Sequence, residues 1–368
     1  MTGARPWIRL VLFAASVFGF AASSQGQNTQ AMFLAWTSGG LPDGFAKTMR
    51  ETPGVSAVTV VRAGNLGLVR AWTATGVEVY QSQSGYSVPL ETMVLDLASY
   101  GPFIPTDQAD LFANLGPTEV LLGSAAAQFR GIGAGGRLKM LDGTQLTVRA
   151  VVDDALIGGG ELALAMTSPV AELIPVDRYL LALYLGPRTI FDAAADAAAR
   201  DQPVRVRKQG EAPFLRHADA VSPQIVIKQV FGEFFFQAQS NGAINREAVW
   251  VERNIVLADV PLLGKLKCHR VLIPLLVGAM EQLIAEGLDF LIDPDAFRGC
   301  DNGRMIGGTR SLSRHSWGAA VDLNYLLDIA ADPRLIRVME RWGFTSGHSW
   351  LISDPGHFEY VGPPQTGG

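Results

Sequence analysis

The sequence predicts an α+β protein of two domains, the first of them rich in β-strands. The chain has 368 residues, which is enough for two ordinary domains. Runs of β-branched residues and strict alternation mark its first half. In the second half, strand-like and helix-like segments are mixed but do not alternate regularly. That irregular order favours a small antiparallel sheet flanked by helices over a parallel α/β sheet.

The N-terminus has the pattern of an export signal. Arg5 and Arg9 precede an almost wholly apolar run, Leu10–Ala22, which is followed by a polar stretch with small residues. The run is too short to span a bilayer comfortably, so residues 1–26 are expected to be a cleaved signal peptide. An uncleaved anchor is the alternative. No integral membrane segment is expected in the mature chain, which should be periplasmic, extracellular or associated with the cell envelope.

Residues 30–186 are expected to form the β-rich, extracytoplasmic domain. Val55–Val61 is a β-branched run, and residues 137–148 alternate on both sides of Asp142-Gly143, which predicts a hairpin. This pattern is similar to that of the extracytoplasmic core domains of some permeases, although their transmembrane helices are absent. The resemblance leaves room for an envelope protein as a partner of this domain.

A glycine-rich motif in the first domain does not predict a nucleotide site. Gly131–Gly136 matches GxGxxG, but that fingerprint binds pyrophosphate only between a strand and the start of a helix. Here an Ala-rich helical segment precedes the motif and a hairpin follows it. We therefore expect a turn between two elements.

Residues 187–213 are expected to form a helix and a linker. Thr189–Arg200 is rich in alanine, and Asp201–Pro213 is polar with two prolines. The basic run Arg205–Lys208 within it should be a solvated face, with contact to an anionic wall polymer as the alternative.

The second domain is expected to span residues 214–365. Apolar spacing, a leading proline and a closing glycine predict two helices, and short apolar runs predict two strands. The helices are Leu275–Glu286 and Pro333–Trp342, and the strands are Ala319–Asn324 and His357–Val361.

The net charge bears on which partners the chain can bind, and the cysteine content bears on the compartment in which it works. The formal net charge of −5 offers no basic footprint for nucleic acid. Cys268 and Cys300 are the chain's two cysteines, and an even pair in an exported protein favours a disulfide. Two buried thiols remain the alternative.

The residues with the clearest chemistry lie near the C-terminus. His315, Asp322 and His357 can make a metal site with three protein ligands and one open position, as catalytic zinc sites have. Asp354 stands three residues before His357, where a general base would be useful. Alternate side chains of a strand share a face, so Glu359 should lie beside His357 as a supporting carboxylate rather than a catalyst.

These residues carry a family resemblance. The quoted motifs are Cys300-Asp-Asn-Gly-Arg304, Ser313-x-His315-x-x-Gly318-x-Ala320-x-Asp322 and Asp354-x-x-His357-Phe-Glu359, with Trp342-Gly-Phe344 and Trp350. Together they resemble the VanY-type D-alanyl-D-alanine carboxypeptidases. Those enzymes belong to a wider group of zinc peptidases that includes lysostaphin-like enzymes and hedgehog signalling domains. The resemblance covers most of residues 245–362.

The resemblance implies a function and a role for each matching residue. One Zn²⁺ would be held by His315, Asp322 and His357, and Asp354 would deprotonate the attacking water. Arg304 would polarise the scissile carbonyl and Ser313 would help to hold the substrate, a peptidoglycan stem peptide. Arg310 and Arg314 compete with Arg304 for the substrate role. His348 stands where relatives often have glycine, and we expect a partly exposed structural histidine.

Three functions stay open at this point. The leading one is a secreted zinc metallopeptidase, most similar to the carboxypeptidase branch, with an endopeptidase as the variant. The second is an envelope module that binds metal without catalysis, for which a base at Asp354 would be unnecessary. In the third, the first domain is the functional part and anchors an envelope complex.

Overall fold

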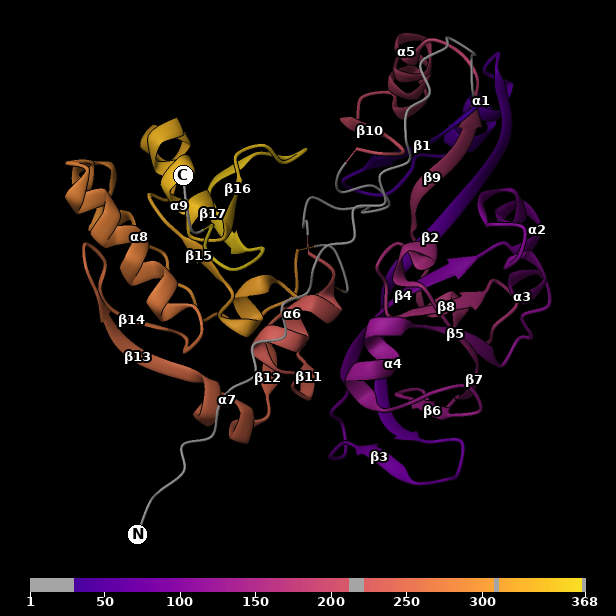
Figure 1. The fold of residues 1–368 in the computed structure, drawn as a ribbon, viewed down its shortest axis with the longest axis horizontal. Coiled ribbons are helices and arrows are strands. Elements are labelled where there is room, and N and C mark those ends of the chain that lie inside the picture. Colours follow the sequence, from indigo (N-terminus) through magenta and orange to yellow (C-terminus); the bar gives the residue numbers. More distant parts are fainter. Residues whose placement is uncertain (1–29, 212–221, 308–310, 366–368) are drawn as a thin grey trace.

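The computed structural model describes residues 30–211, 222–307 and 311–365. A large sheet domain and a smaller mixed domain lie next to each other (Figure 1), which confirms the α+β class. The expected signal peptide, residues 1–26, falls outside the described residues. Within the described ranges, no helix is both long and apolar enough to cross a membrane.

The first domain is built on one ten-stranded sheet. Its strands are β1 (Ala31–Thr37), β2 (Val55–Trp72), β3 (Glu78–Gln81), β4 (Val88–Leu95), β5 (Glu119–Gly123), β6 (Arg137–Met140), β7 (Gln145–Val152), β8 (Leu162–Ala165), β9 (Asp177–Tyr184) and β10 (Val204–Lys208). They follow the order β10-β1-β9-β2-β4-β8-β5-β7-β6, and β3 pairs with β2. Because β6 also pairs with β2, the strands from β2 to β6 in this order close on themselves. One apolar cluster takes side chains from every strand of that ring.

Short helices connect these strands. They are α1 (Phe45–Glu51), α2 (Leu97–Tyr100), α3 (Ala109–Ala113), α4 (Ser124–Arg130) and α5 (Arg188–Ala199). The expected hairpin over residues 137–148 is formed by β6 and β7. Gly131–Gly136 lies between α4 and β6, and Gly131 ends the helix in the left-handed conformation with φ 66°. The motif is therefore a turn after a helix, as expected.

The segment expected to be a helix and linker contains more structure than the sequence predicts. The helix is present as α5. Residues 204–208, however, form β10, which pairs antiparallel with β1 from the opposite end of the domain. An edge strand keeps one side open to solvent and tolerates basic side chains, so its composition resembles that of a polar linker.

The second domain contains the helices and strands that its apolar spacing predicts, together with a second hairpin. Its elements are α6 (Gln224–Phe231), β11 (Phe236–Ala238), β12 (Ile244–Arg246), α7 (Ala248–Asn254), β13 (Ile255–Val260), β14 (Gly264–His269), α8 (Ile273–Ala285), β15 (Ala320–Asp322), α9 (Pro333–Arg341), β16 (Phe344–Gly347) and β17 (Asp354–Tyr360). β15, β17 and β16 form an antiparallel sheet in that order.

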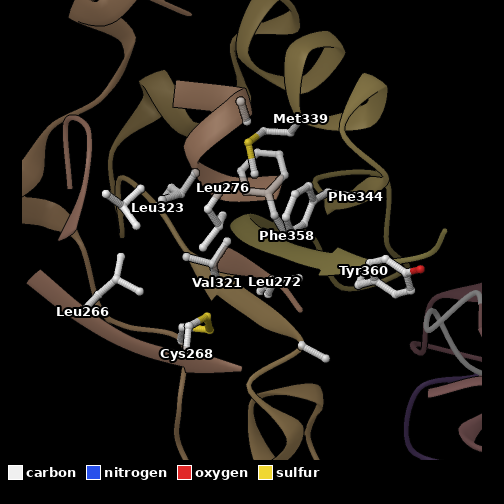
Figure 2. Packing of buried hydrophobic residues seen from close by; sticks show 14 of the residues in the cluster. Leu266, Cys268, Leu272, Leu276, Val321, Leu323, Met339, Phe344, Phe358 and Tyr360 are labelled. Carbon is white, nitrogen blue, oxygen red and sulfur yellow. A yellow bond between two sulfur atoms is a disulfide. The ribbon is translucent and has the colours of Figure 1, made fainter. Parts of the chain in front are cut away.

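One face of this small sheet packs on the helices. Figure 2 shows Phe358 of β17 and Phe344 of β16 grouped with Met339 of α9 and Leu276 of α8. All four side chains are buried. Because Phe358 points into this core, its neighbours His357 and Glu359 must face the other side of the sheet.

Helix α6 joins the two domains. Its Ile225 packs in the cluster enclosed by the closed strands of the first domain, whereas Ile227 and Phe231 belong to the core of the second. The buried Lys228 of α6 also forms an ion pair with Glu161 of the first domain at 2.8 Å. The domains therefore share a buried apolar and ionic contact.

Candidate metal centre

His315 is held in place by a single short helical turn. Residues Arg314–Trp317 form a 3₁₀ turn, and the Ser313 Oγ accepts a hydrogen bond from the His315 backbone N at 3.4 Å. Gly318 ends the turn at φ 60°, and a Cβ there would lie 2.7 Å from the His269 backbone N. Only glycine fits both the conformation and the close approach, so the motif's glycine sets the path from His315 into β15.

Asp322 and His357 face each other on neighbouring strands. They are register partners in the antiparallel pair β15–β17. Directly opposite residues have Cβ atoms on the same side of the sheet and close together. The sheet register therefore brings together two ligand candidates that are far apart in the sequence, on the face away from Phe358.

The three predicted ligands converge on one point. His315 Nε2 lies 3.1 Å from Asp322 Oδ1 and 3.3 Å from His357 Nδ1, and His357 Nδ1 lies 3.0 Å from Asp322 Oδ1. The histidine side chains are buried, whereas the Asp322 side chain keeps 21% of its surface exposed. The cluster is thus buried on the imidazole side and open to solvent at the carboxylate.

The neighbours of each imidazole ring on its outer side set which ring nitrogen faces the cluster. His315 Nδ1 lies 2.9 Å from the Cys300 carbonyl oxygen, which can only accept, so Nδ1 carries a proton and Nε2 is the nitrogen that faces the cluster. On His357 the outer nitrogen is Nε2, which lies 3.5 Å from Glu359 Oε2. Outer partners of this kind orient metal-binding histidines in general.

The electrostatics of the cluster suit a cation. Burial alone would raise the pKa of Asp322, but hydrogen bonds with His315 and His357 hold it well below its usual range. Burial would lower the pKa of His357, yet hydrogen bonds with Asp322 and Glu359 outweigh it and raise this pKa to about 9. Asp322 is therefore a carboxylate that attracts positive charge, whether a proton or a metal ion.

The donor set fits a metal ion of the zinc type. One ligand atom from each of His315, Asp322 and His357 lies within 4.8 Å of the other two. Two imidazole nitrogens and one carboxylate oxygen match the ligand preference of catalytic zinc, which keeps a fourth position for water or substrate.

Asp354, Arg304 and Ser313 lie around the cluster without belonging to it. Asp354 is exposed at the first position of β17. Arg304 is partly buried, and its backbone N and O both bond to Ser316 Oγ, at 3.0 and 2.8 Å. Ser313 is 4% exposed, and its backbone N donates to the Arg304 carbonyl at 3.1 Å. Their catalytic and substrate-binding roles stay predictions.

The cysteines support the same region. Cys268 of β14 and Cys300 are joined in a disulfide with a Cα–Cα distance of 5.3 Å. The Cys300 carbonyl is the acceptor for His315, so the covalent link fixes the chain segment that orients this histidine. The neighbouring His269 is buried, and its Nε2 lies 3.0 Å from the Phe231 carbonyl oxygen.

Trp350 and Arg246 make two further contacts around the cluster. Trp350 lies with its ring centroid 4.9 Å from that of His357. Arg246 donates two hydrogen bonds to the Asp301 carboxylate, at 2.7 and 3.1 Å. It also donates to the Ser316 carbonyl at 2.9 Å, and this bond stabilises the 3₁₀ turn. Arg246 is 55 residues from Asp301 and 70 from Ser316 in the sequence, so no local pattern indicates its contacts.

The arginines that compete with Arg304 are separated by their surroundings. Arg314 is 8% exposed, and its Nη2 donates to the Ser222 carbonyl at 2.5 Å, which gives it a structural contact. Arg310 lies outside the described residues. His348 is exposed, as expected for a residue outside the core.

Comparison with known proteins bears on this region. Residues 307–360 match the family model of D-alanyl-D-alanine carboxypeptidases. This match confirms the resemblance in the C-terminal domain, and it contains His315, Asp322 and His357. The second domain is therefore similar to a zinc-dependent peptidase family. No curated protein matches the chain.

Three solved structures are among those similar to this chain. They are a domain of a protein described as a permease from Porphyromonas gingivalis (16% identity, TM-score 0.30, covering 53% of this chain and 94% of that one), the periplasmic region of MacB from Actinobacillus actinomycetemcomitans (10%, 0.31, 48% and 87%), and the extracellular domain of the ABC-type transporter YknZ from Gram-positive bacteria (10%, 0.30, 48% and 99%).

Proposed function

We propose that this chain is an exported zinc metallopeptidase that acts on peptidoglycan stem peptides as a D-alanyl-D-alanine carboxypeptidase. One observation carries the proposal: the cluster of His315, Asp322 and His357 lies inside the segment that matches the carboxypeptidase family. The compartment follows from the N-terminal pattern of the sequence. In this proposal residues 30–186 are an extracytoplasmic domain, which can also meet an envelope protein.

The residues of the chain divide the chemistry between them. When bound, Zn²⁺ supplies Lewis acidity that polarises a carbonyl and lowers the pKa of water toward neutrality. His315, Asp322 and His357 would hold the ion, and Glu359 would keep the His357 ring in its orientation. The Asp354 carboxylate would accept the proton of the attacking water and return it to the leaving amine. Arg304 would donate to the scissile carbonyl oxygen, and Ser313 would help to hold the peptide beside it.

Measuring zinc content and D-alanine release on the same preparations distinguishes a residue that binds the metal from one that acts as the base. Replacing His315, Asp322 or His357 with alanine removes a ligand, so zinc and activity should fall together. Asp354→Asn should keep its zinc and lose about 10²–10⁴-fold in activity, the usual range for a positioned general base. Asp328→Asn, an exposed carboxylate elsewhere in the domain, is the matched control and should behave as wild type.

The products decide the reaction class. The zinc-loaded protein is incubated with a pentapeptide stem and the fragments are identified by mass. Release of the terminal D-alanine supports the carboxypeptidase, whereas cleavage at an internal bond or a cross-link makes the protein an endopeptidase. Zinc binding with no hydrolysis of either substrate would leave a metal-binding envelope module. An Asp354→Asn variant that loses its zinc would make Asp354 a ligand.

A further inference from the structure

The loop of residues 348–353, between β16 and β17, is contacted by the first domain. Arg205 Nη2 of β10 donates a hydrogen bond to the Ser349 carbonyl oxygen at 2.9 Å. Leu351 packs against an apolar cluster of the first domain that includes Leu34 of β1 and Val61 of β2. Figure 1 shows this loop, in yellow, extending from the small sheet toward β10. We call residues 348–353 the bridging loop.

The same loop borders the candidate metal centre. Trp350 stands between the two residues that contact the first domain, and its ring is tilted against that of His357 with 4.9 Å between centroids. Asp354 is the residue that follows the loop. Ser349 and Leu351 therefore face the first domain, whereas Trp350 faces the cluster, and the predicted base starts the strand just beyond.

Bonds within the loop make it a short connected unit. The Trp350 N donates to the Gly347 carbonyl at 3.1 Å, and the Ser353 Oγ donates to the His348 carbonyl at 2.9 Å. Six residues tied in this way cannot shift at Ser349 without moving Trp350. Ile352 is 61% exposed, and His348, Ser349 and Ser353 are exposed as well, so much of the loop faces solvent.

The contacts of the bridging loop are separate from those that join the domains. Helix α6 connects the two cores through Ile225, Ile227 and the buried ion pair of Lys228 with Glu161. Loss of the Arg205 hydrogen bond leaves that connection intact. A substitution at Arg205 should therefore leave the connection through α6 in place and should not separate the domains.

We propose that the first domain positions the bridging loop, so that Arg205 and the apolar contact of Leu351 hold Trp350 against His357 and set the place of Asp354. Arg205 is then a positioning residue for the peptidase, although it belongs to the other domain. The catalytic part of this inference rests on the proposed function, whereas the contact itself does not. A partner bound to the first domain could change activity through the same path.

The experiment measures hydrogen exchange of the bridging loop and hydrolysis of the pentapeptide on the full-length chain. Arg205→Ala should speed exchange in residues 348–353 by about 2–10-fold, the factor expected for the loss of one hydrogen bond of ordinary net strength. Its kcat should fall by about 10–100-fold through misplacement of Asp354, with KM and zinc content little changed. Arg205→Lys should restore part of the slow exchange and part of the kcat, because an ammonium group can still donate to the Ser349 carbonyl.

Arg200→Ala is the matched control. Arg200 Nη2 makes the same kind of bond, 3.0 Å to the Asp43 carbonyl, but within the first domain. It should leave the exchange of the loop and the kinetics unchanged. Leu351→Ala tests the apolar contact and should speed exchange as Arg205→Ala does.

Two results would overturn the inference. If the bridging loop exchanged at the wild-type rate in both Arg205→Ala and Leu351→Ala, the first domain would not hold the loop in place. Faster exchange with an unchanged kcat would show that the contact has no part in catalysis. A wild-type protein that hydrolyses no stem peptide would defeat the proposed function instead, and the exchange rates would still decide whether the first domain holds the loop.

Discussion

The ionic cluster at the contact between the domains makes the most demanding prediction about stability. Glu161 is fully buried, and its carboxylate accepts hydrogen bonds from Lys228 Nζ at 2.8 and 3.1 Å and from Arg130 Nη2 at 2.5 Å. Both cations also pair with Glu233, at 2.7 and 2.5 Å. Two positive and two negative side chains, drawn from both domains, thus balance each other away from water.

Replacing Glu161 with glutamine removes one of the two negative charges and leaves two buried cations facing Glu233 alone. Breaking a buried ion pair by removing one partner costs about 3–5 kcal/mol, because a charge stays buried without compensation. We expect a loss of that size in the free energy of unfolding of Glu161→Gln. The double variant Glu161→Gln/Lys228→Met restores one cation to one anion and should recover part of the loss.

The assay is equilibrium unfolding in urea, followed by circular dichroism, with the slope of the transition compared among variants. Glu172→Gln is the control: Glu172 pairs with Arg62 at 3.5 Å, but its side chain is 82% exposed. A surface pair of this kind contributes about 0–1 kcal/mol. If Glu161→Gln lost no more stability than Glu172→Gln, the cluster would not stabilise the contact between the domains.

Three further predictions concern packing, the disulfide and pH. In α8, a Cβ at Gly278 would lie 2.1 Å from the Trp342 ring, so Gly278→Ala should cost about 1–3 kcal/mol in urea unfolding, whereas Gly101→Ala, with open space around it, should not. Exported protein should show no free thiol before denaturation and reduction, and the bridge, with a sequence separation of 32, should contribute about 3–4 kcal/mol; two thiols titrated in the native protein would contradict this. Burial alone would raise the pKa of Glu161, but the charges of Lys228 and Arg130 lower it from 4.5 to about 2. The stabilising contribution of the Glu161 carboxylate is therefore complete above pH 4.5 and is lost as the pH falls toward 2. The melting temperature should therefore drop across that interval in the wild type and less in Glu161→Gln.

Local patterns predicted much of the fold because they report on faces and turns. The spacing in Leu275–Glu286 and Pro333–Trp342 reproduced α8 and α9, and the alternation around Asp142-Gly143 reproduced the β6–β7 hairpin. β10 was missed, because a basic edge strand and a polar linker have the same composition. Its partner β1 lies at the other end of the domain, and no local signal indicates the pairing.

The sequence by itself determined the chemistry of the candidate site. His315, Asp322 and His357 were predicted as one cluster from their spacing and family resemblance, and the expected side of Glu359 followed from strand alternation. The prediction of the cluster depends on residue type, spacing and the family resemblance, and the side of Glu359 depends on the period of a strand.

Only the tertiary structure decided what surrounds the site. The register of β15 against β17 sets Asp322 opposite His357, and α6 joins the cores of the two domains. The contact of Arg205 with Ser349 links residues 144 apart in the chain. Such contacts form because the apolar faces and buried charges of separate elements must be shielded from water simultaneously. Which elements shield each other is decided by the packing of the whole chain and not by any one segment of the sequence.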